Sequence, residues 1–176
     1  MSDSTNTPAS DPEACSSPMA TTAEHERFAP FVGTFAATVT MWMGPGEPSV
    51  TTGTMVNTLE LGGRFLHQVY QGDPAPGPFG DFAGRGYWGY NTTAQCYEGF
   101  WIDSVCTFFQ IETGHVDDSG TTWEMHGTMT HPETGDSMSK RSVITLVNEN
   151  EHVMEMFFDF GGQETKTMEI RYTRTA

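Results

Sequence analysis

From residue 33 onward, apolar and polar residues of this chain alternate over a series of short segments, and turn-forming residues separate these segments. The clearest segment spans residues 33–43, in which five apolar residues share one face: Phe35, Ala37, Val39, Met41 and Met43. This alternation is typical of a strand with one buried face. About ten such segments predict an all-β fold, a closed up-and-down antiparallel barrel of about ten strands.

One short helix and an N-terminal tail complete the expected organisation. Thr22 is a suitable N-cap, and Phe28, Phe31 and Val32 follow at near-helical spacing, so we expect one short helix that ends between Pro30 and Gly33 and closes one end of the barrel. Residues 1–21 have the composition of a disordered tail, which leaves residues 22–176 as the barrel domain. The expected strands are 33–43, 50–61, 65–71, 82–90, 95–103, 105–113, 122–130, 138–147, 152–160 and 165–174.

The last hairpin allows a prediction of register. A strict two-residue turn at Gly161-Gly162 would place apolar residues of one strand opposite polar residues of the other. A three-residue loop with a glycine bulge shifts the pairing by one residue, and apolar residues then face each other. We therefore predict three pairs: Met156 with Met168, Met154 with Ile170, and His152 with Tyr172.

Charge and composition exclude several classes of partner. Lys and Arg number 8 against 23 for Asp and Glu, a formal net charge of -15, which disfavours nucleic acids and anionic membranes because both require a basic face. The three cysteines show no zinc-binding spacing, and Cys96 and Cys106 are expected to be free thiols. No run approaches the ~18 apolar residues of a membrane helix, and the N-terminus lacks the features of a secretory signal, so a cytoplasmic location is expected.

The two chain extremes are predicted to close the barrel. If the last strand pairs with the first in antiparallel orientation, Arg174 lies near Phe35, and a guanidinium over an aromatic ring is a favourable contact. This arrangement resembles the signature of the calycin superfamily, which includes lipocalins and fatty-acid-binding proteins. In that signature a Gly-x-Trp begins the first strand and a basic residue of the last strand covers the ring; here Phe35 replaces the tryptophan.

The chain also resembles a bacterial family of unknown function, domain of unknown function 1579. The resemblance is carried, in order, by Glu24-His25, Leu61-Gly62-Gly63-Arg64-Phe65-Leu66, Pro78-Phe79-Gly80, Gly89-Tyr90-Asn91, Trp101-Ile102-Asp103-Ser104, Met168-Glu169-Ile170 and Tyr172-Thr173-Arg174. It implies a calycin-like barrel and no established activity.

Candidate ligand-binding residues follow from the expected strand faces. The aromatic and methionine candidates are Trp88, Tyr97, Trp101, Met154 and Met156, and the polar candidates are Asp103, Arg141, His152 and Tyr172. Asp103 shares a face with Trp101, and its partner would be Arg85 or Arg141, either as an anchor for a ligand or as a structural buried pair. An arginine facing the interior could bind a carboxylate or phosphate bidentately, whereas an arginine at the rim would be plain surface charge.

The six histidines show no metal-binding spacing. Nitrobindin, a barrel relative, binds haem through one histidine, and His152 on the apolar Met/Phe face would be the equivalent ligand. A lone histidine is more often structural, so we expect no haem, no other cofactor and no metal.

Three functional hypotheses remain open. The leading one is a barrel that binds a small apolar or amphipathic molecule in its interior. The second is an enzyme in the same cavity, such as an isomerase, cyclase or hydrolase, for which Asp103, His126 and His152 are the titratable candidates, although no catalytic motif is present. The third is a filled structural or oligomerising barrel, with a homo-oligomer as the partner arrangement.

Overall fold

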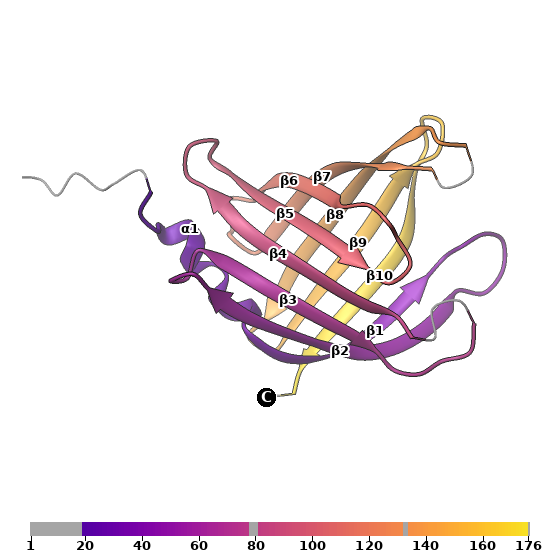
Figure 1. Cartoon of the computed structure of the whole chain (residues 1–176), viewed down its shortest axis with the longest axis horizontal. Helices are drawn as coiled ribbons and strands as arrows, with labels where there is room; N and C mark the ends of the chain where they lie inside the picture. The colour runs from indigo at the N-terminus through magenta and orange to yellow at the C-terminus, as the bar shows by residue number, and fades with distance from the viewer. Residues whose placement is uncertain (1–18, 78–80, 132–133, 176) are drawn as a thin grey trace, which may run out of the picture.

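The computed structural model describes residues 19–77, 81–131 and 134–175, and these form one closed ten-strand barrel (Figure 1). The tail expected at residues 1–21 lies largely outside the described residues. Each strand pairs in antiparallel orientation with its neighbours in the chain, and β1 pairs with β10 to close the ring. The elements are α1 (Ala23–Glu26), η1 (Ala29–Phe31), β1 (Gly33–Met41), β2 (Ser49–Glu60), β3 (Phe65–Gly72), β4 (Ala83–Asn91), β5 (Cys96–Asp103), β6 (Gln110–Val116), β7 (Thr122–Thr130), β8 (Ser137–Asn148), β9 (Glu151–Asp159) and β10 (Glu164–Arg174). The all-β, up-and-down barrel predicted from the alternation is confirmed.

The closing seam has the predicted register. Phe35 is the direct neighbour of Arg174 across β1 and β10, and the Arg174 guanidinium carbon lies 4.5 Å from the centre of the Phe35 ring. The Phe35 side chain is fully buried. Arg174 also donates hydrogen bonds to the backbone oxygens of Val32 and Pro30, each at 2.6 Å. One side chain therefore ties the last strand to the first strand and to the segment that precedes it.

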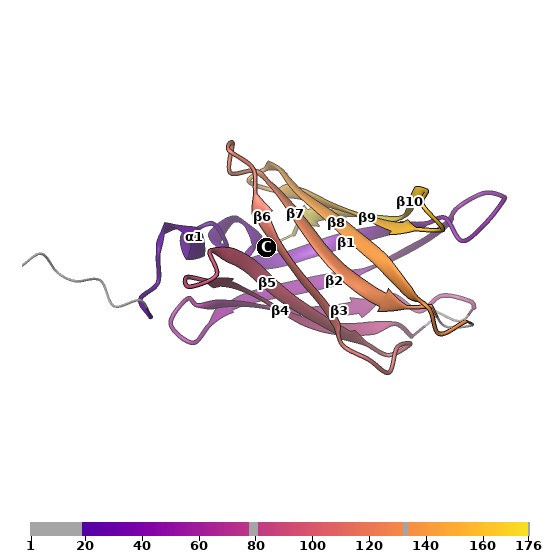
Figure 2. The ribbon, with the colours of Figure 1, turned by 90° about the horizontal axis from the view of Figure 1, so that it is seen from above.

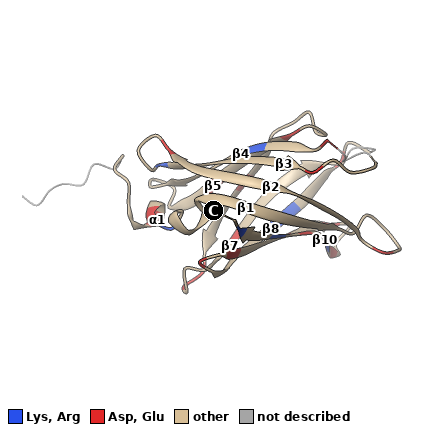
Figure 3. Cartoon of the chain, turned by 90° about the horizontal axis from the view of Figure 1, so that it is seen from below, with Lys and Arg blue, Asp and Glu red and all other residues tan. Residues whose placement is uncertain are grey.

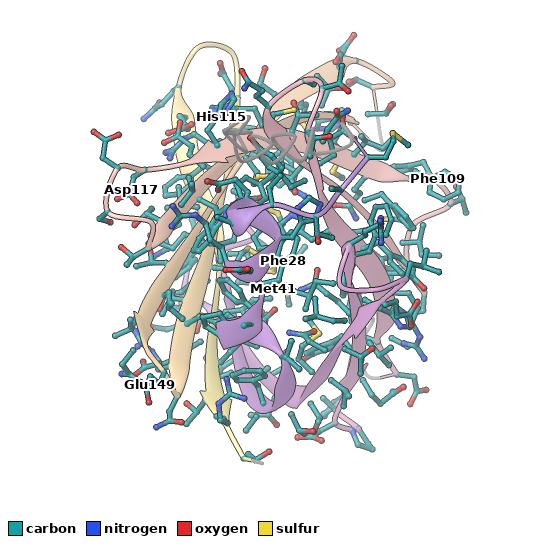
Figure 4. All side chains as sticks on the ribbon, turned by 90° about the vertical axis from the view of Figure 1, so that its left-hand side faces the viewer. Phe28, Met41, Phe109, His115, Asp117 and Glu149 are labelled. Carbon is teal, nitrogen blue, oxygen red and sulfur yellow. The ribbon has the colours of Figure 1, made fainter. Side chains whose placement is uncertain are left out.

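The two ends of the barrel differ. The helical segment crosses one end, and its Phe28 and Phe31 pack into a buried cluster with Trp88, Tyr97 and Trp123 (Figures 1 and 2). Figure 4 views the molecule from that end. Phe28 lies near the middle of the ring of strands, whereas Asp117 and Glu149 lie at its edge. The helix is interrupted at Phe28, so the expected single helix is a four-residue α1 followed by the 3-10 turn η1. This segment closes one end of the barrel, as predicted.

Three predicted strand boundaries are wrong by more than one residue. The strand expected to end at residue 113 continues to Val116. The strand expected at 105–113 begins only at Gln110, because one carboxylate oxygen of Asp103 accepts the backbone N–H groups of Val105 and Cys106. Amides held by a side chain in this way form a turn and are not available to a β-ladder. The first strand ends at Met41 instead of at residue 43, and Met43 is 74% exposed.

The register of the last hairpin is confirmed, but its cause differs from the prediction. Met156 pairs with Met168, Met154 with Ile170, and His152 with Tyr172. Next to the turn, however, Asp159 pairs with Glu164, which is the register of a strict two-residue turn. The shift of one residue arises at a bulge between Lys166 and Met168, inside β10.

None of the described helices is long and apolar enough to cross a membrane. Acidic residues are distributed over the loops at both ends of the barrel, while basic residues are few (Figure 3).

Candidate functional site

The barrel encloses a cavity of about 830 Å³. Its inner end is formed by Phe31 of η1 and by His152 of β9, and its outer end by loop residues such as Gly44, Asp73 and Phe160. These loops lie at the end of the barrel opposite the helices, so the cavity is closed at the helical end and reached from the other. The alternation along each strand places every second residue in this cavity.

One wall of the cavity carries a connected polar network. The Lys140 ammonium on β8 donates to the Glu112 carboxylate and to the Gln110 side-chain oxygen on β6, both at 3.2 Å. The other Glu112 oxygen accepts a hydrogen bond from the Ser142 hydroxyl at 2.7 Å, and the Gln110 amide donates to Asp103 on β5 at 3.1 Å. Lys140 is only 4% exposed, so its charge is buried and depends on Glu112 for compensation.

A glycine makes this ion pair sterically feasible. Glu112 and Lys140 lie on strands separated by β7, and Gly127 of β7 is the lateral neighbour of both. A Cβ atom at Gly127 would lie 3.0 Å from the Glu112 Cγ and 2.3 Å from the Ile111 carbonyl oxygen. The two charged side chains therefore meet over a position that has to lack a side chain.

The wall formed by β1, β10 and β9, which continues from β8, is apolar and rich in methionine. Met41, Met154, Met156 and Met168 come from β1, β9 and β10 and line the cavity together with Phe158. Methionine is flexible and polarizable and adapts to irregular apolar shapes. The cavity is thus amphipathic, because the polar groups of β5, β6 and β8 lie beside thioethers and aromatic rings.

Trp101 forms part of the wall next to the polar network. Its indole lies over two glycines of β4, since a Cβ atom at Gly84 would lie 2.0 Å from the ring and one at Gly86 would lie 2.7 Å from it. Gly86 is the direct neighbour of Trp101, and Gly84 is that of Asp103. Trp101 and Asp103 therefore share the inner face of β5, as the alternation predicted.

His152 and Tyr172 lie at the closed end of the cavity. Their rings stack with centroids 4.4 Å apart, and His152 also contacts the rings of Phe31 and Phe35 edge-on. Burial, helped by the charge of Arg174, lowers the pKa of His152 from 6.5 to about 4, so the imidazole is neutral at pH 7. Its Nδ1 atom is buried and has no hydrogen-bond partner among the described residues. Burial, followed by the proximity of Tyr70, raises the pKa of Tyr172.

Seven of the nine predicted ligand-binding residues line the cavity: Trp88, Trp101, Asp103, His152, Met154, Met156 and Tyr172. Tyr97 points to the helical end, where its hydroxyl donates to the Glu24 carboxylate at 2.6 Å and its ring packs on Phe28. It contributes to closure of the barrel and does not face the cavity.

Arg141, a candidate ligand-binding residue, does not face the cavity and is surface charge, the second of the two alternatives that the sequence left open. Its guanidinium binds the Glu164 carboxylate through Nε at 2.8 Å and Nη2 at 2.6 Å, and it lies over the Phe157 ring on the outer surface. Arg85 does not pair with Asp103 either, since it donates to the backbone oxygens of Tyr70 and Gly84. His126, one of the catalytic candidates, also lies outside the cavity, 2.9 Å from Glu124 with its side chain 60% exposed.

Sequence reasoning missed the core of the polar network, namely Gln110, Glu112, Lys140 and Ser142. The alternation of side chains gives only a conditional signal for Lys140: it faces the inside if Arg141 faces the outside. Among the described residues, no group of three or more histidine, cysteine or acidic side chains could hold a metal ion.

Comparison with known proteins identifies the family. The family model described as "Protein of unknown function (DUF1579)" matches residues 20–174. The chain belongs to this family. No curated protein of known function matches. Membership of the DUF1579 family agrees with the resemblance noted in the sequence and with a calycin-like barrel.

One solved structure supports the fold, and two others align less well. The crystal structure of Rv2717c from M. tuberculosis aligns with a TM-score of 0.61 at 14% identity, over 88% of this chain and 99% of that one. A redesigned beta barrel, b11L5F_LGL, aligns with a TM-score of 0.44 at 16% identity, over 84% of this chain and 94% of that one. EF1p2_mFAP2b bound to DFHBI aligns with a TM-score of 0.44 at 13% identity, over 86% and 99%. At these identities the likeness extends to the fold alone, and the two lower scores carry no argument.

Proposed function

We propose that this protein binds a small amphipathic molecule inside the barrel. The observation that carries the proposal is the cavity of about 830 Å³, whose volume lies within the range of about 300–1,000 Å³ typical of ligand pockets. A barrel stabilised only by its own side chains would leave far less space, since protein interiors are close-packed. The volume therefore favours a binding protein over a filled structural barrel.

The chemistry of the walls favours an amphipathic ligand over a purely apolar one. The methionine wall offers apolar contact, whereas Asp103, Glu112 and Lys140 offer a polar surface at the same depth. The buried and unpartnered Nδ1 atom of His152 adds a polar group at the closed end. A buried polar group without a partner is costly, so a ligand or water that binds it stabilises the protein.

Binding is better supported than catalysis. Of the three titratable candidates, His126 lies outside the cavity, and Asp103 already accepts three hydrogen bonds that hold a turn and the Gln110 side chain. His152 remains, but it lies at the closed end, stacked on Tyr172. We also propose a cytoplasmic location, which the free thiols of Cys96 and Cys106 support because reducing compartments keep cysteines unpaired.

The test uses Nile red, an uncharged apolar fluorophore whose emission rises in dry surroundings. We expect saturable binding of one dye per chain. The substitution Val39→Trp, which places a large side chain in the cavity, should abolish it. The matched control is Thr38→Trp, on the exposed face of the same strand, which should bind dye normally. Met156→Trp on β9, two strands from β1, provides a second blocking variant. Dye binding that is absent, or equal in blocked and control variants with native circular dichroism, would refute the proposal.

A further inference from the structure

The charged groups that line the cavity are unbalanced. Three carboxylates, of Asp73, Asp103 and Glu112, face a single ammonium group, that of Lys140, within the described residues. Lys140 is already paired with Glu112 and bonded to Gln110. No arginine of the described barrel lines the cavity, because Arg141 and Arg85 are bound on the outside. The interior therefore has spare negative charge and no unpaired positive charge.

On these grounds we propose that the cavity, in the binding role proposed above, selects amphiphiles with an amine or other hydrogen-bond-donating head and rejects carboxylates. An anionic head would enter beside Asp103 and Glu112 without a free cation to compensate it, and burial of an unpaired charge is strongly unfavourable. An ammonium head instead gains a carboxylate partner.

The hydrogen-bonding capacity of the acidic groups agrees with a donating head. A carboxylate offers about four lone-pair sites. Asp103 uses three of them, for Val105, Cys106 and Gln110, and Glu112 uses two, for Ser142 and Lys140. Both can accept a further donor. Trp101, two residues before Asp103 on β5, adds aromatic surface beside the carboxylate, and cations are attracted to aromatic faces.

The entrance of the cavity is negatively charged, as its interior is. The loops at the open end contain the acidic residues Glu47, Asp73, Asp81 and Asp136 and neither lysine nor arginine. Lys166, near this end on β10, is bound by Glu155 and Glu169 and lies over the Trp42 ring. With a formal net charge of -15, the whole protein raises the local concentration of cations and repels anions.

The experiment is a displacement of Nile red by three ligands with the same chain: dodecylamine, dodecanol and dodecanoate, each below its micellar concentration and at 150 mM salt. We expect dodecylamine to compete at least about tenfold better than dodecanoate, with dodecanol between them, because the two charged heads differ by two unit charges at a partly screened contact distance. Equal or better competition by dodecanoate would overturn the inference and leave the proposed function intact. Failure of Nile red itself to bind is the separate outcome that refutes the proposed function.

A charge-matched pair of variants locates the effect. Glu112→Gln leaves the Lys140 ammonium without its carboxylate and should shift the preference towards dodecanoate by about tenfold or more. Glu124→Gln makes the same change of net charge on the outer surface, where Glu124 is 54% exposed, and should leave the preference unchanged. Lys140→Met, which removes the cation and keeps Glu112, should increase the preference for the amine. An unchanged preference in both Glu112→Gln and Lys140→Met would overturn the assignment to this site.

Discussion

Removal of the Arg174 side chain is the sharpest test of how the barrel is closed. The guanidinium donates to three backbone oxygens, those of Val32 and Pro30 at 2.6 Å and that of Glu149 at 3.1 Å, and it covers the buried Phe35 ring. A hydrogen bond from a charged donor contributes about 1.5–3 kcal/mol when buried, and a guanidinium over an aromatic ring about 0.5–2 kcal/mol.

These contributions do not add fully, because Arg174 is only partly buried and water can replace it at the freed carbonyls. We therefore expect Arg174→Ala to lower the free energy of unfolding by about 3–4 kcal/mol. For a domain of this size the melting temperature would fall by about 10 °C. Urea denaturation followed by tryptophan fluorescence measures the first quantity, and differential scanning calorimetry measures the second.

The matched control is Arg171→Ala, on the same strand, where an exposed arginine pairs with Glu151. Exposed ion pairs contribute about 0–1 kcal/mol, so this variant should be nearly neutral. A double-mutant cycle with Phe35→Leu isolates the ring contact, for which we expect a coupling of about 0.5–2 kcal/mol. If Arg174→Ala is no more destabilising than Arg171→Ala, the contacts of Arg174 at the seam do not stabilise the fold.

Three further predictions concern the interior. The pKa of His152 is lowered to about 4, so the unfolded chain binds a proton before the folded one as the pH falls below 6.5, and the folded state loses stability. His152→Gln should reduce this loss between pH 6.5 and 4 by about 3 kcal/mol. Urea denaturation at several pH values measures it. Phe31→Ala should lower the free energy of unfolding by about 3–5 kcal/mol, because it leaves a void among Trp88, Trp123 and His152, and thermal melts will measure it. Gly127→Ala should cost about 1–3 kcal/mol and separate Lys140 from Glu112, visible as a shift of the lysine ammonium signal in NMR.

Each of these predictions has an outcome that contradicts it. A pH profile of His152→Gln that parallels the native one would show that His152 is not a buried neutral group. The control for that variant is His126→Gln at an exposed site. Native stability of Phe31→Ala would mean that η1 does not plug the barrel. An unchanged ammonium signal in Gly127→Ala would mean that the ion pair does not depend on the missing side chain.

The fold could be predicted from sequence because its determinants are local. Alternation fixes the face of strands such as β1, glycine-rich turns fix the connections, and chain order then fixes the antiparallel neighbours. The seam followed from the same reasoning, since Phe35 and Arg174 are the first and last inward residues of their strands. The pattern of residues led to a wrong prediction between Ser104 and Phe109, where apolar residues are spaced as in a strand but no strand forms. The deciding interaction there is the Asp103 side chain, which captures two backbone amides.

The bulge in β10 shows why a correct register can have an unexpected origin. Thr167 is the extra residue, and its backbone oxygen accepts a hydrogen bond from the Trp42 amide while its hydroxyl donates to the Met156 oxygen. These partners lie on other segments, so the turn sequence alone could not reveal them. Matching of apolar faces gave the right pairing because the tertiary core, and not the turn, selects the register.

Prediction of the candidate site depended on β8, a strand with apolar residues on both of its faces. On β8 the outward residues Val143 and Val147 are as apolar as the inward Ile144 and Leu146, so the hydrophobic pattern does not say whether Lys140 or Arg141 faces the cavity. Which of these two side chains faces the cavity decides whether the site has a free cation. An inward Arg141 would supply a cation for a carboxylate ligand. The residue that does face inward, Lys140, is already paired with Glu112 across Gly127. A shift of one residue on a single strand thus separates a fatty-acid type of site from an amine type of site, which makes the Glu112→Gln and Glu124→Gln pair the decisive comparison.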